Sequence, residues 1–358
     1  MVRRTVGGMG AFEAVKQAKY LARRVAAEAY ALTPGFLQAV RGKVVILMYH
    51  RVVGDEELSR QYIQPGMYVT TSIFEQHVNF LKKYFEVISL RDLLSMWEEQ
   101  RWDPSRRYCV MTFDDGWLDN YTYALPVLRE HAVPATIFLP TAFIGTDNWF
   151  WPEKVVWIYG QYAAREEGEK QRSLEALRRR HSWLGGLTSA VLGGDINALI
   201  ENCKAFKPEQ IDMFVSSWAD TLEVSLPTER LVINWDEVRE MSAAGISFGS
   251  HSVSHRILTK LEPREVVQEV EDSWAVLTQQ HVNSVPVFCY PNGDWSAEIG
   301  SAVKAAGYRA ATTTEFGYEG RTPTDPFGLK RVNVHNHITF TDNLFAFHLA
   351  GYNNIRMR

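Results

Sequence analysis

Short apolar segments recur along the chain, separated by longer stretches in which apolar residues follow helical spacing. These segments occupy residues 43–49, 85–89, 108–113, 135–140, 245–250, 285–290, 308–313 and 329–334. Several are nearly continuous runs of aliphatic and aromatic residues, as in "KVVILMY" and "YCVMTF". Because polar residues do not alternate with the apolar ones, the pattern predicts strands that are buried on both faces.

Helices are predicted between these strands, at residues 72–84, 235–245, 262–280 and 296–307. Two of these stretches end in the glycine that commonly follows a helix C-terminus. Strand and helix alternate about eight times along the chain. This alternation is typical of an α/β fold with a parallel sheet and right-handed crossovers, either closed into a barrel or left open.

The alternation breaks between about residues 141 and 230, where helices and polar loops replace the strands. We therefore expect one barrel or sheet domain, residues 43–140 and 231–340, with a mostly helical insertion at 141–230. Residues 1–42 are expected to form an N-terminal helical segment, and residues 341–358 a C-terminal helix or tail. Because the insertion follows a strand, in a barrel it belongs to the face where active sites are built, as a lid or a substrate wall.

Composition narrows the class of protein. The 358 residues are 46% hydrophobic, which is ample for a folded core. The 38 basic and 42 acidic residues are mixed along the chain without a basic stripe, so nucleic acid is not expected as a partner. The three cysteines are an odd number and do not indicate a disulfide framework.

The start of the chain carries neither a continuous apolar signal core nor a small-residue cleavage site, and no run approaches the ~18 apolar residues of a membrane span. Cytoplasmic residence is therefore expected. Residues 11–32 have apolar positions at helical spacing opposite a basic face. We expect a helix packed on the main domain or on a partner, with a helix on a membrane surface as the alternative.

Polar residues follow the ends of several predicted strands. They are His50, Asp114, Asp115, His251, His255, Asn292, Asp294, His335 and His337. In parallel α/β sheets, residues just past the carboxyl ends of the strands line the functional crevice. The sequence therefore predicts one active site assembled from distant parts of the chain.

The stretch "CVMTFDDGW" ends in two adjacent aspartates, Asp114 and Asp115, which repel each other unless a positive charge lies nearby. The stretch "HSVSH" places His251 and His255 four residues apart, on one side of a helical turn or a tight loop. Two imidazoles and one carboxylate supply three ligands to a divalent cation and leave positions open for catalysis. We expect one aspartate to bind this metal and its neighbour to take a proton from water.

Two motifs carry a resemblance to a known family. "TFDDGW" (112–117) and "SHSVSH" (250–255) resemble the first two motifs of the polysaccharide deacetylases, the NodB-like carbohydrate esterase family 4. The resemblance covers residues 43–140 and 231–335 and leaves the N-terminal segment and the insertion uncovered. It implies a distorted barrel of about seven β/α units. It also implies a metal-dependent hydrolase that removes N-acetyl or O-acetyl groups from glycans.

By position, the resemblance implies that Asp114 is the catalytic base and that Asp115, His251 and His255 bind the metal. The implied metal is zinc, with Co²⁺, Ni²⁺ and Fe²⁺ as alternatives. The family's catalytic acid is a histidine in a Leu-x-x-His motif, usually near the C-terminus. Here "LMYH" (47–50) fits that motif at the other end of the chain, as in some circularly permuted exopolysaccharide deacetylases. His50 is thus the expected acid, and His335 is its competitor.

The family's third motif is altered. "VFCYPNGDW" (287–295) places Tyr290 before the proline and has no arginine nearby. Arg331 is a candidate for orienting the base. We group it with the other candidate substrate-binding residues of the groove, which are Tyr290, Asn292, Asp294, Trp295 and His335.

An aromatic cluster opens the insertion: Trp149, Phe150, Trp151 and Trp157. Aromatic rings stack on sugar faces, yet rings at helical spacing are more often core residues, and we expect a core role here.

The expected substrate is an acetylated glycan, a polysaccharide or a lipid-linked sugar. Two other functions remain open. A non-heme iron oxygenase also uses two histidines and one carboxylate, but usually with a His-x-Asp motif that is absent here. A catalytically silent carbohydrate-binding relative is the second alternative.

Overall fold

The computed structural model describes residues 21–30, 35–60, 62–184, 187, 191 and 194–352. Its centre is a parallel sheet in the order β1-β10-β9-β8-β7-β6-β5-β4. The strands are β1 (Val44–Tyr49), β4 (Glu86–Val87), β5 (Tyr108–Phe113), β6 (Thr136–Leu139), β7 (Ser247–Ser250), β8 (Ser284–Cys289), β9 (Ala310–Phe316) and β10 (Leu329–Asn333). All the predicted strands are therefore present.

The sheet closes on itself because β1 pairs with β5 as well as with β10. The β1–β5 register runs from Val44 opposite Tyr108 to Tyr49 opposite Phe113. β4 pairs only with the first two residues of β5, outside the closed ring. The seven strands of the ring confirm the barrel that the resemblance implies.

Alternate residues of the strands enter two different hydrophobic clusters. In β1, Val44 and Ile46 belong to the same cluster as Val287 and Leu329 of other strands. Their neighbours, such as Val45, pack with the surrounding helices. Both faces of the strands are thus buried, as their unbroken apolar sequences predict.

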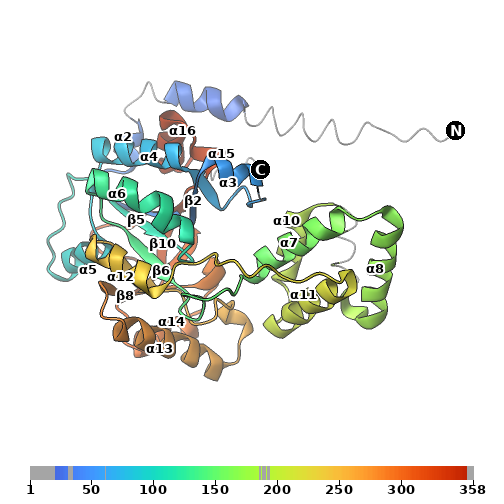
Figure 1. The fold of residues 1–358 in the computed structure, drawn as a ribbon. Coiled ribbons are helices and arrows are strands. Elements are labelled where there is room, and N and C mark those ends of the chain that lie inside the picture. The colour runs from blue at the N-terminus through green and yellow to red at the C-terminus, as the bar shows by residue number, and fades with distance from the viewer. Residues whose placement is uncertain are drawn as a thin grey trace.

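Helices surround the barrel (Figure 1). They are α4 (Thr71–Tyr84), α5 (Leu90–Glu98), α6 (Leu125–His131), α12 (Trp235–Ala243), α13 (Pro263–Gln279) and α14 (Ala297–Ala305). Local sequence sets their ends. Asn234, for example, accepts a hydrogen bond from the Glu237 amide, and the Glu237 side chain accepts one from the Asn234 amide, which forms a capping box at the start of α12.

A small parallel pair, β2 (Arg51–Val53) and β3 (Tyr68–Thr70), lies beside the barrel and was not predicted. Each strand has three residues, too few for a period to emerge from the sequence. Between them lies α3 (Asp55–Arg60). This arm matters because it directly follows His50.

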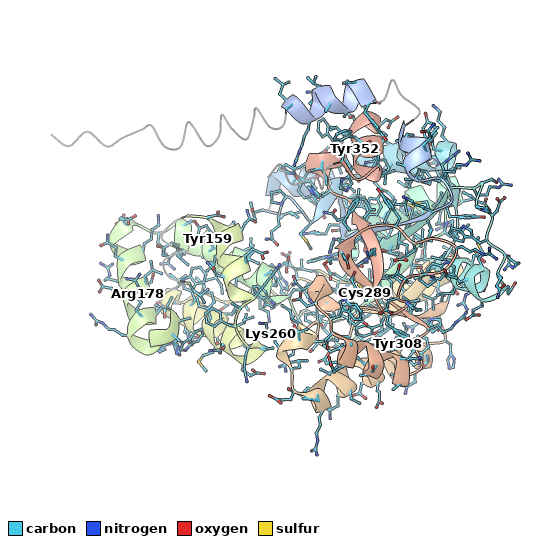
Figure 2. The ribbon with its side chains drawn as sticks, turned by 180° about the vertical axis from the view of Figure 1, so that it is seen from behind. Tyr159, Arg178, Lys260, Cys289, Tyr308 and Tyr352 are labelled. Carbon is cyan, nitrogen blue, oxygen red and sulfur yellow. The ribbon has the colours of Figure 1, made fainter. Side chains whose placement is uncertain are left out.

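The chain between β6 and β7 folds into helices that project from one side of the barrel (Figure 1). They are α7 (Trp151–Ala163), α8 (Glu167–Arg180), α10 (Ile196–Cys203) and α11 (Pro208–Leu222). These helices have a hydrophobic cluster of their own, centred on Phe214 and Trp218. Tyr159 and Arg178 mark this insertion in the rear view, well separated from Tyr308 on the barrel (Figure 2). The chain between these two strands is thus mostly helical in the structure.

Residues 21–30 form a helix; the remainder of the predicted helix over 11–32 lies outside the described residues. This helix packs beside α16 (Asp342–Leu349), where Asn343 donates a hydrogen bond to Glu28 at 2.6 Å. The side chains of Leu21 and Val25 on this helix are 61% and 62% exposed. Within the described ranges, the helices are too short or too polar to cross a membrane. The cytoplasmic location stays a prediction.

Candidate active site

The carboxyl ends of the barrel strands bring five of the predicted site residues to one cavity of about 170 Å³. These residues are His50, Asp114, Asp115, His251 and His255. They come from β1, β5 and β7, which are far apart in sequence but meet at the same end of the barrel. Tyr290 and Asn292, after β8, line the same cavity.

Asp115, His251 and His255 form a compact group that fits a metal ion. Asp115 Oδ1 lies 3.3 Å from His251 Nε2 and 3.1 Å from His255 Nε2. His251 Nδ1 donates a hydrogen bond to the Cys289 carbonyl at 2.7 Å, so this ring nitrogen carries the proton and Nε2 keeps a lone pair for a ligand. Two imidazole nitrogens and one carboxylate oxygen suit zinc and leave the remaining coordination positions open.

The backbone around these ligands is unusual. Asp115 has φ 75° and His255 has φ 57°, the left-handed region that non-glycine residues seldom adopt and that is enriched at functional sites. Gly116 follows with φ 66°, and a Cβ there would lie 2.8 Å from Leu139 Cδ2. The glycine of "TFDDG" is therefore required by both conformation and space. Glu269 holds the other ligand loop by accepting hydrogen bonds from the amides of Val253 and Ser254.

Asp114 is bound by Arg331 from the last strand of the barrel. Arg331 Nη1 and Nη2 donate to Asp114 Oδ1 and Oδ2, each at 2.7 Å, and both side chains are buried. Burial raises the pKa of Asp114, but the Arg331 guanidinium, with His251 and His50, outweighs burial and lowers it. The carboxylate therefore stays ionised and is held in one orientation.

His50 lies opposite this pair, with its Nε2 4.0 Å from Asp114 Oδ2. Its backbone carbonyl accepts a hydrogen bond from Asn120 Nδ2 at 2.8 Å, which anchors the residue at the end of β1. Burial lowers the pKa of His50, and the Asp115 and Asp114 carboxylates oppose that shift.

His335 is placed differently. It does not line the active-site cavity, and burial, together with His348, lowers its pKa to about 4. Because His335 does not line the cavity, it is the weaker candidate for a proton donor to a substrate bound there.

The altered third motif forms a tight turn at Pro291–Gly293. Both hydrogen-bond donors of Tyr290 are paired: its backbone N–H donates to the Thr312 carbonyl and its hydroxyl donates to the Phe327 carbonyl. Asn292 has φ 60°, and its backbone N–H makes no hydrogen bond with any residue that the structure describes. An unpaired amide in the lining of this cavity is a candidate donor to an oxyanion.

The other candidate groove residues lie outside the active-site cavity. Asp294 accepts a hydrogen bond from Asn292 Nδ2, and Trp295 stacks on Tyr290 with ring centroids 5.8 Å apart. Arg331 is fully buried behind Asp114. In this structure these residues support the site from behind and do not line the active-site cavity.

Sequence reasoning missed a second layer of contacts below the site. Trp117 Nε1 donates to Asp115 Oδ2 at 2.9 Å, and the Arg51 guanidinium lies 4.7 Å from the Trp117 ring. Arg51 in turn donates to Asp119 at 2.6 Å. In the sequence, these contacts were indicated only by the polar residues that follow the two aspartates in "DDGWLDN". In the structure, a π-helical turn, which is rare and often found at functional sites, begins at Asn120.

The predicted aromatic cluster divides. Phe150 is 3% exposed and packs in the barrel core, and Trp149 is also buried. Trp151 is half-buried and lines the active-site cavity, so a purely structural role does not describe it.

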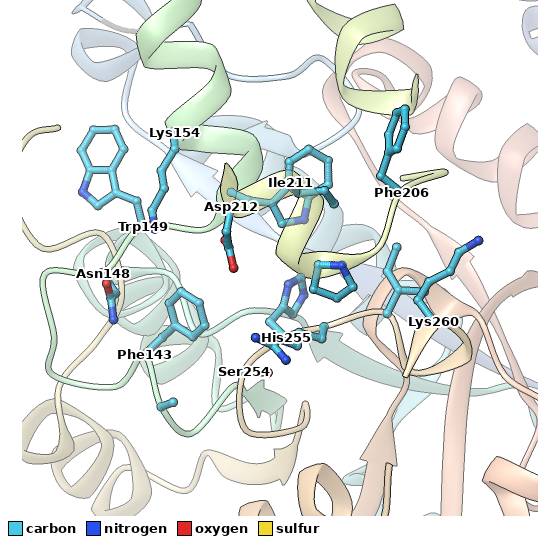
Figure 3. Close-up of a pocket in the computed structure, with 15 residues that line it drawn as sticks. Phe143, Asn148, Trp149, Lys154, Phe206, Ile211, Asp212, Ser254, His255 and Lys260 are labelled. Atoms are coloured by element: carbon cyan, nitrogen blue, oxygen red, sulfur yellow. The ribbon is translucent and has the colours of Figure 1, made fainter. Parts of the chain in front are cut away.

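Two further cavities adjoin the site. One, of about 240 Å³, lies on the far side of His255 between the insertion and the barrel (Figure 3). Its apolar wall includes Phe143, Trp149 and Ile211, and Lys154 and Asp212 extend toward it (Figure 3). The other, of about 410 Å³, lies between α7 and the arm after His50.

The fold and the site together describe a class of protein: a barrel hydrolase with an aspartate–histidine pair beside a candidate metal centre. Known proteins point to the same class. A sequence model of the polysaccharide deacetylase family matches residues 102–182 and 209–311. The chain belongs to the polysaccharide deacetylase family. It is therefore a deacetylase that acts on an acetylated polysaccharide.

Individual relatives are distant. YxkH of Bacillus subtilis, which is named as a polysaccharide deacetylase, is 22% identical over 293 residues, 82% of this chain and 71% of YxkH. The deacetylase PplD of Streptococcus pyogenes, solved in complex with acetate, aligns with a TM-score of 0.53 at 18% identity, over 85% of this chain and 97% of PplD. IcaB of Ammonifex degensii aligns with a TM-score of 0.52 at 16% identity, over 87% of this chain and 97% of IcaB. These two structures share the fold.

Proposed function

We propose that the protein is a metal-dependent enzyme that removes N-acetyl groups from a glycan, with Asp114 as the base and His50 as the acid. One observation carries the proposal. A carboxylate held ionised by Arg331 faces a histidine across 4.0 Å, beside a group of one aspartate and two histidines. This combination supplies an acceptor and a donor of protons in one cavity.

Asp115, His251 and His255 would hold the metal, and zinc suits this donor set best, with Co²⁺, Ni²⁺ and Fe²⁺ as alternatives. When bound, the cation supplies charge that polarises the acetyl carbonyl and makes a water more acidic. The cation also accounts for the two adjacent aspartates, because Arg331 offsets the charge of Asp114 and the cation offsets that of Asp115.

Asp114 takes the proton of the attacking water. Its two oxygens are fixed by Arg331, so the carboxylate is ready in one orientation and pays little entropy in the reaction. Because Arg331 lowers its pKa, the base is ionised well below neutral pH. The backbone N–H of Asn292 donates a hydrogen bond to the oxyanion that forms as the water adds to the acetyl carbonyl.

His50, when protonated, gives its proton to the departing nitrogen. An amide anion is a very poor leaving group, so N-deacetylation depends on this step more than O-deacetylation does. His50 and Asp114 line the same cavity, so a proton donor and a proton acceptor can reach the same bound acetamido group. We therefore favour N-linked over O-linked acetyl groups.

Two alternatives are less well supported. The metal ligand group alone would also serve a non-heme iron oxygenase, but that chemistry has no use for an ionised aspartate held by an arginine. A silent carbohydrate-binding relative would not need the complete set of base, acid and metal ligands.

The test is acetate release from N-acetylhexosamine oligomers and from lipid-linked acetylated sugars, with bound metal measured in the same samples. Asp114→Asn is expected to keep its metal and lose at least about a hundredfold in kcat, the usual contribution of a general base. Full activity in Asp114→Asn would show that the base is assigned wrongly.

A further inference from the structure

The cavity of about 410 Å³ beside the active site has a distinct chemistry. It lies between the arm that follows β1 and helix α7 of the insertion, and it shares Gln64 and Met67 with the active-site cavity. A molecule that extends from the active site past these two residues enters it. The residues that define its chemistry are Arg51, Glu153, Trp149, Trp157, Gln161 and Glu229.

Arg51 forms part of the wall of this cavity and is held rigidly. It is 7% exposed, its Nε donates to Asp119 at 2.6 Å, and its guanidinium lies 4.7 Å from the Trp117 ring. Within the described ranges, no hydrogen bond reaches its two terminal nitrogens. The cavity therefore contains fixed donors that still lack an acceptor.

Glu153, on the first turn of α7, supplies acceptors to the same cavity. Its own backbone amide donates to its carboxylate, and no other residue of the described chain does. Burial raises its pKa to about 7, with that backbone hydrogen bond and Arg51 opposing this shift and Asp115 adding to it. A half-buried carboxylate that is hydrogen-bonded only by its own backbone is stabilised by a ligand that supplies further hydrogen-bond donors.

Aromatic rings complete the lining. Trp157 is half-buried on α7, and Trp149 is fixed by a hydrogen bond from its Nε1 to the Glu229 carbonyl at 2.9 Å. A sugar ring has an apolar C–H face for such rings and hydroxyl groups that both donate and accept hydrogen bonds. Planar polar side chains beside indole rings therefore match a pyranose ring well.

The charges choose among sugars. Asp119 already neutralises Arg51, and the two other ionisable groups of the wall, Glu153 and Glu229, bring no positive charge. A uronic acid or a phosphorylated sugar would find no unpaired cation there, and it would be repelled by Glu229 and by Glu153 whenever Glu153 is ionised. The cavity is therefore matched to an uncharged sugar.

We propose that this cavity is a second sugar-binding site, which holds an uncharged pyranose unit of the same glycan whose N-acetyl group lies in the active site. The proposal rests on the proposed function, and it makes the substrate an oligosaccharide or polysaccharide that spans both cavities. The insertion then determines chain-length preference through α7.

The test compares N-acetylhexosamine tetrasaccharide with the monosaccharide in steady-state kinetics of the metal-loaded enzyme. Trp157→Ala is expected to lower the ratio of kcat/KM for the tetrasaccharide to that for the monosaccharide about tenfold, the worth of one good ring contact. Glu153→Gln is expected to lower the ratio in the same direction. Trp157→Phe, which keeps a ring, should restore most of it and guards against a folding defect in Trp157→Ala.

Tyr159→Ala is the matched control, because Tyr159 is a half-buried aromatic residue on the same helix that lines none of the three cavities. Its ratio should equal that of the unaltered protein. The same tetrasaccharide is also titrated calorimetrically into Asp114→Asn, with and without Trp157→Ala, so that binding is measured apart from turnover.

The outcomes separate the two proposals. Turnover with a ratio that neither Trp157→Ala nor Glu153→Gln changes overturns the second sugar site and leaves the proposed function standing. Binding that depends on Trp157 without acetate release by the unaltered enzyme overturns the proposed function and leaves the sugar site standing. A uronic acid oligomer that competes more strongly than the neutral tetrasaccharide overturns the preference for an uncharged unit.

Discussion

Arg331 and Asp114 form a bidentate ion pair, although the residues lie 217 positions apart in the sequence. The two terminal guanidinium nitrogens each lie 2.7 Å from a carboxylate oxygen. The next residue, Asp115, lies 3.1 and 3.3 Å from two histidine nitrogens instead. Adjacent carboxylates thus coexist because each has its own positive or hydrogen-bonding partner. This division gives them different chemical roles.

Arg331→Gln is expected to move the acidic limb of the pH profile of kcat/KM to higher pH. Arg331 lowers the pKa of Asp114 against the effect of burial, so removing the guanidinium raises that pKa. Because the base must be ionised, activity then disappears at a higher pH than in the unaltered enzyme. The measurement is the pH profile of metal-loaded protein, with circular dichroism to verify folding.

Arg331→Lys keeps the charge without the two-pronged geometry and should give a smaller displacement. Arg309→Gln, at an exposed ion pair with Glu98, serves as the control and should leave the profile where it was. An acidic limb unmoved in Arg331→Gln, with metal fully bound, would remove the proposed role of Arg331.

Chelation of the metal is expected to abolish acetate release, and added Zn²⁺ should restore it. In the metal-free protein burial lowers the pKa of His251, but Cys289 and Asp115 outweigh burial and raise it well above its usual value. Protons therefore compete with the metal, and affinity should rise with pH by about tenfold per unit for each proton displaced. Competition with a chelating dye between pH 6 and 8 measures this slope.

Asp115→Ala should lose the metal at every pH, whereas Asp114→Asn should retain it, since only Asp115 belongs to the ligand group with both histidines. Equal metal content in the two variants would contradict the division of roles between the aspartates.

His50→Gln is expected to separate amide from ester hydrolysis. Loss of the proton donor should reduce deacetylation of N-acetyl sugars by about a hundredfold or more. Hydrolysis of an aryl acetate should fall far less, because a phenolate leaves without a proton. The two substrates are compared in initial-rate assays.

The matched variant is His335→Gln, at the competing histidine, which should behave alike toward both substrates. If His335→Gln, and not His50→Gln, lost amide hydrolysis while keeping ester hydrolysis, the acid would be His335.

Gly116→Ala is expected to destabilise the protein by about 2–4 kcal/mol in urea unfolding, the sum of a left-handed alanine and a tight contact. The added methyl group would meet Leu139 Cδ2 at 2.8 Å at a residue with φ 66°. Gly320→Ala is the control, because no atom lies within 4 Å of a Cβ there and its φ is ordinary. Its stability should change by less than about 0.5 kcal/mol.

The continuous apolar runs and the helical periods between them predicted a parallel α/β sheet, and the resemblance to the deacetylases implied that this sheet closes into a barrel. The sequence also predicted that His50, Asp114, Asp115, His251 and His255 meet, because strand ends of a parallel barrel share one edge. The short strands β2 and β3 escaped prediction because three residues carry no period.

The sequence could not define the supporting contacts. Arg331 was a candidate for orienting the base, but its two hydrogen bonds to Asp114 depend on closure of the barrel, which sets β10 beside β1 and β1 beside β5. The hydrogen bond from Trp117 to Asp115 and the unpaired amide of Asn292 depend on local backbone angles, which residue types constrain only weakly. Such details follow from three-dimensional packing and not from spacing.

Closure of the barrel has a consequence for the synthesis of the protein. His50 directly follows the first strand of the ring, and Arg331 lies on the last. A growing chain on the ribosome exposes both aspartates and both histidines before the residue that holds Asp114 has been made. The protein therefore becomes catalytically active only after β10 joins the barrel. A truncated chain that lacks this strand has no arginine to hold Asp114 and should not act on the glycan.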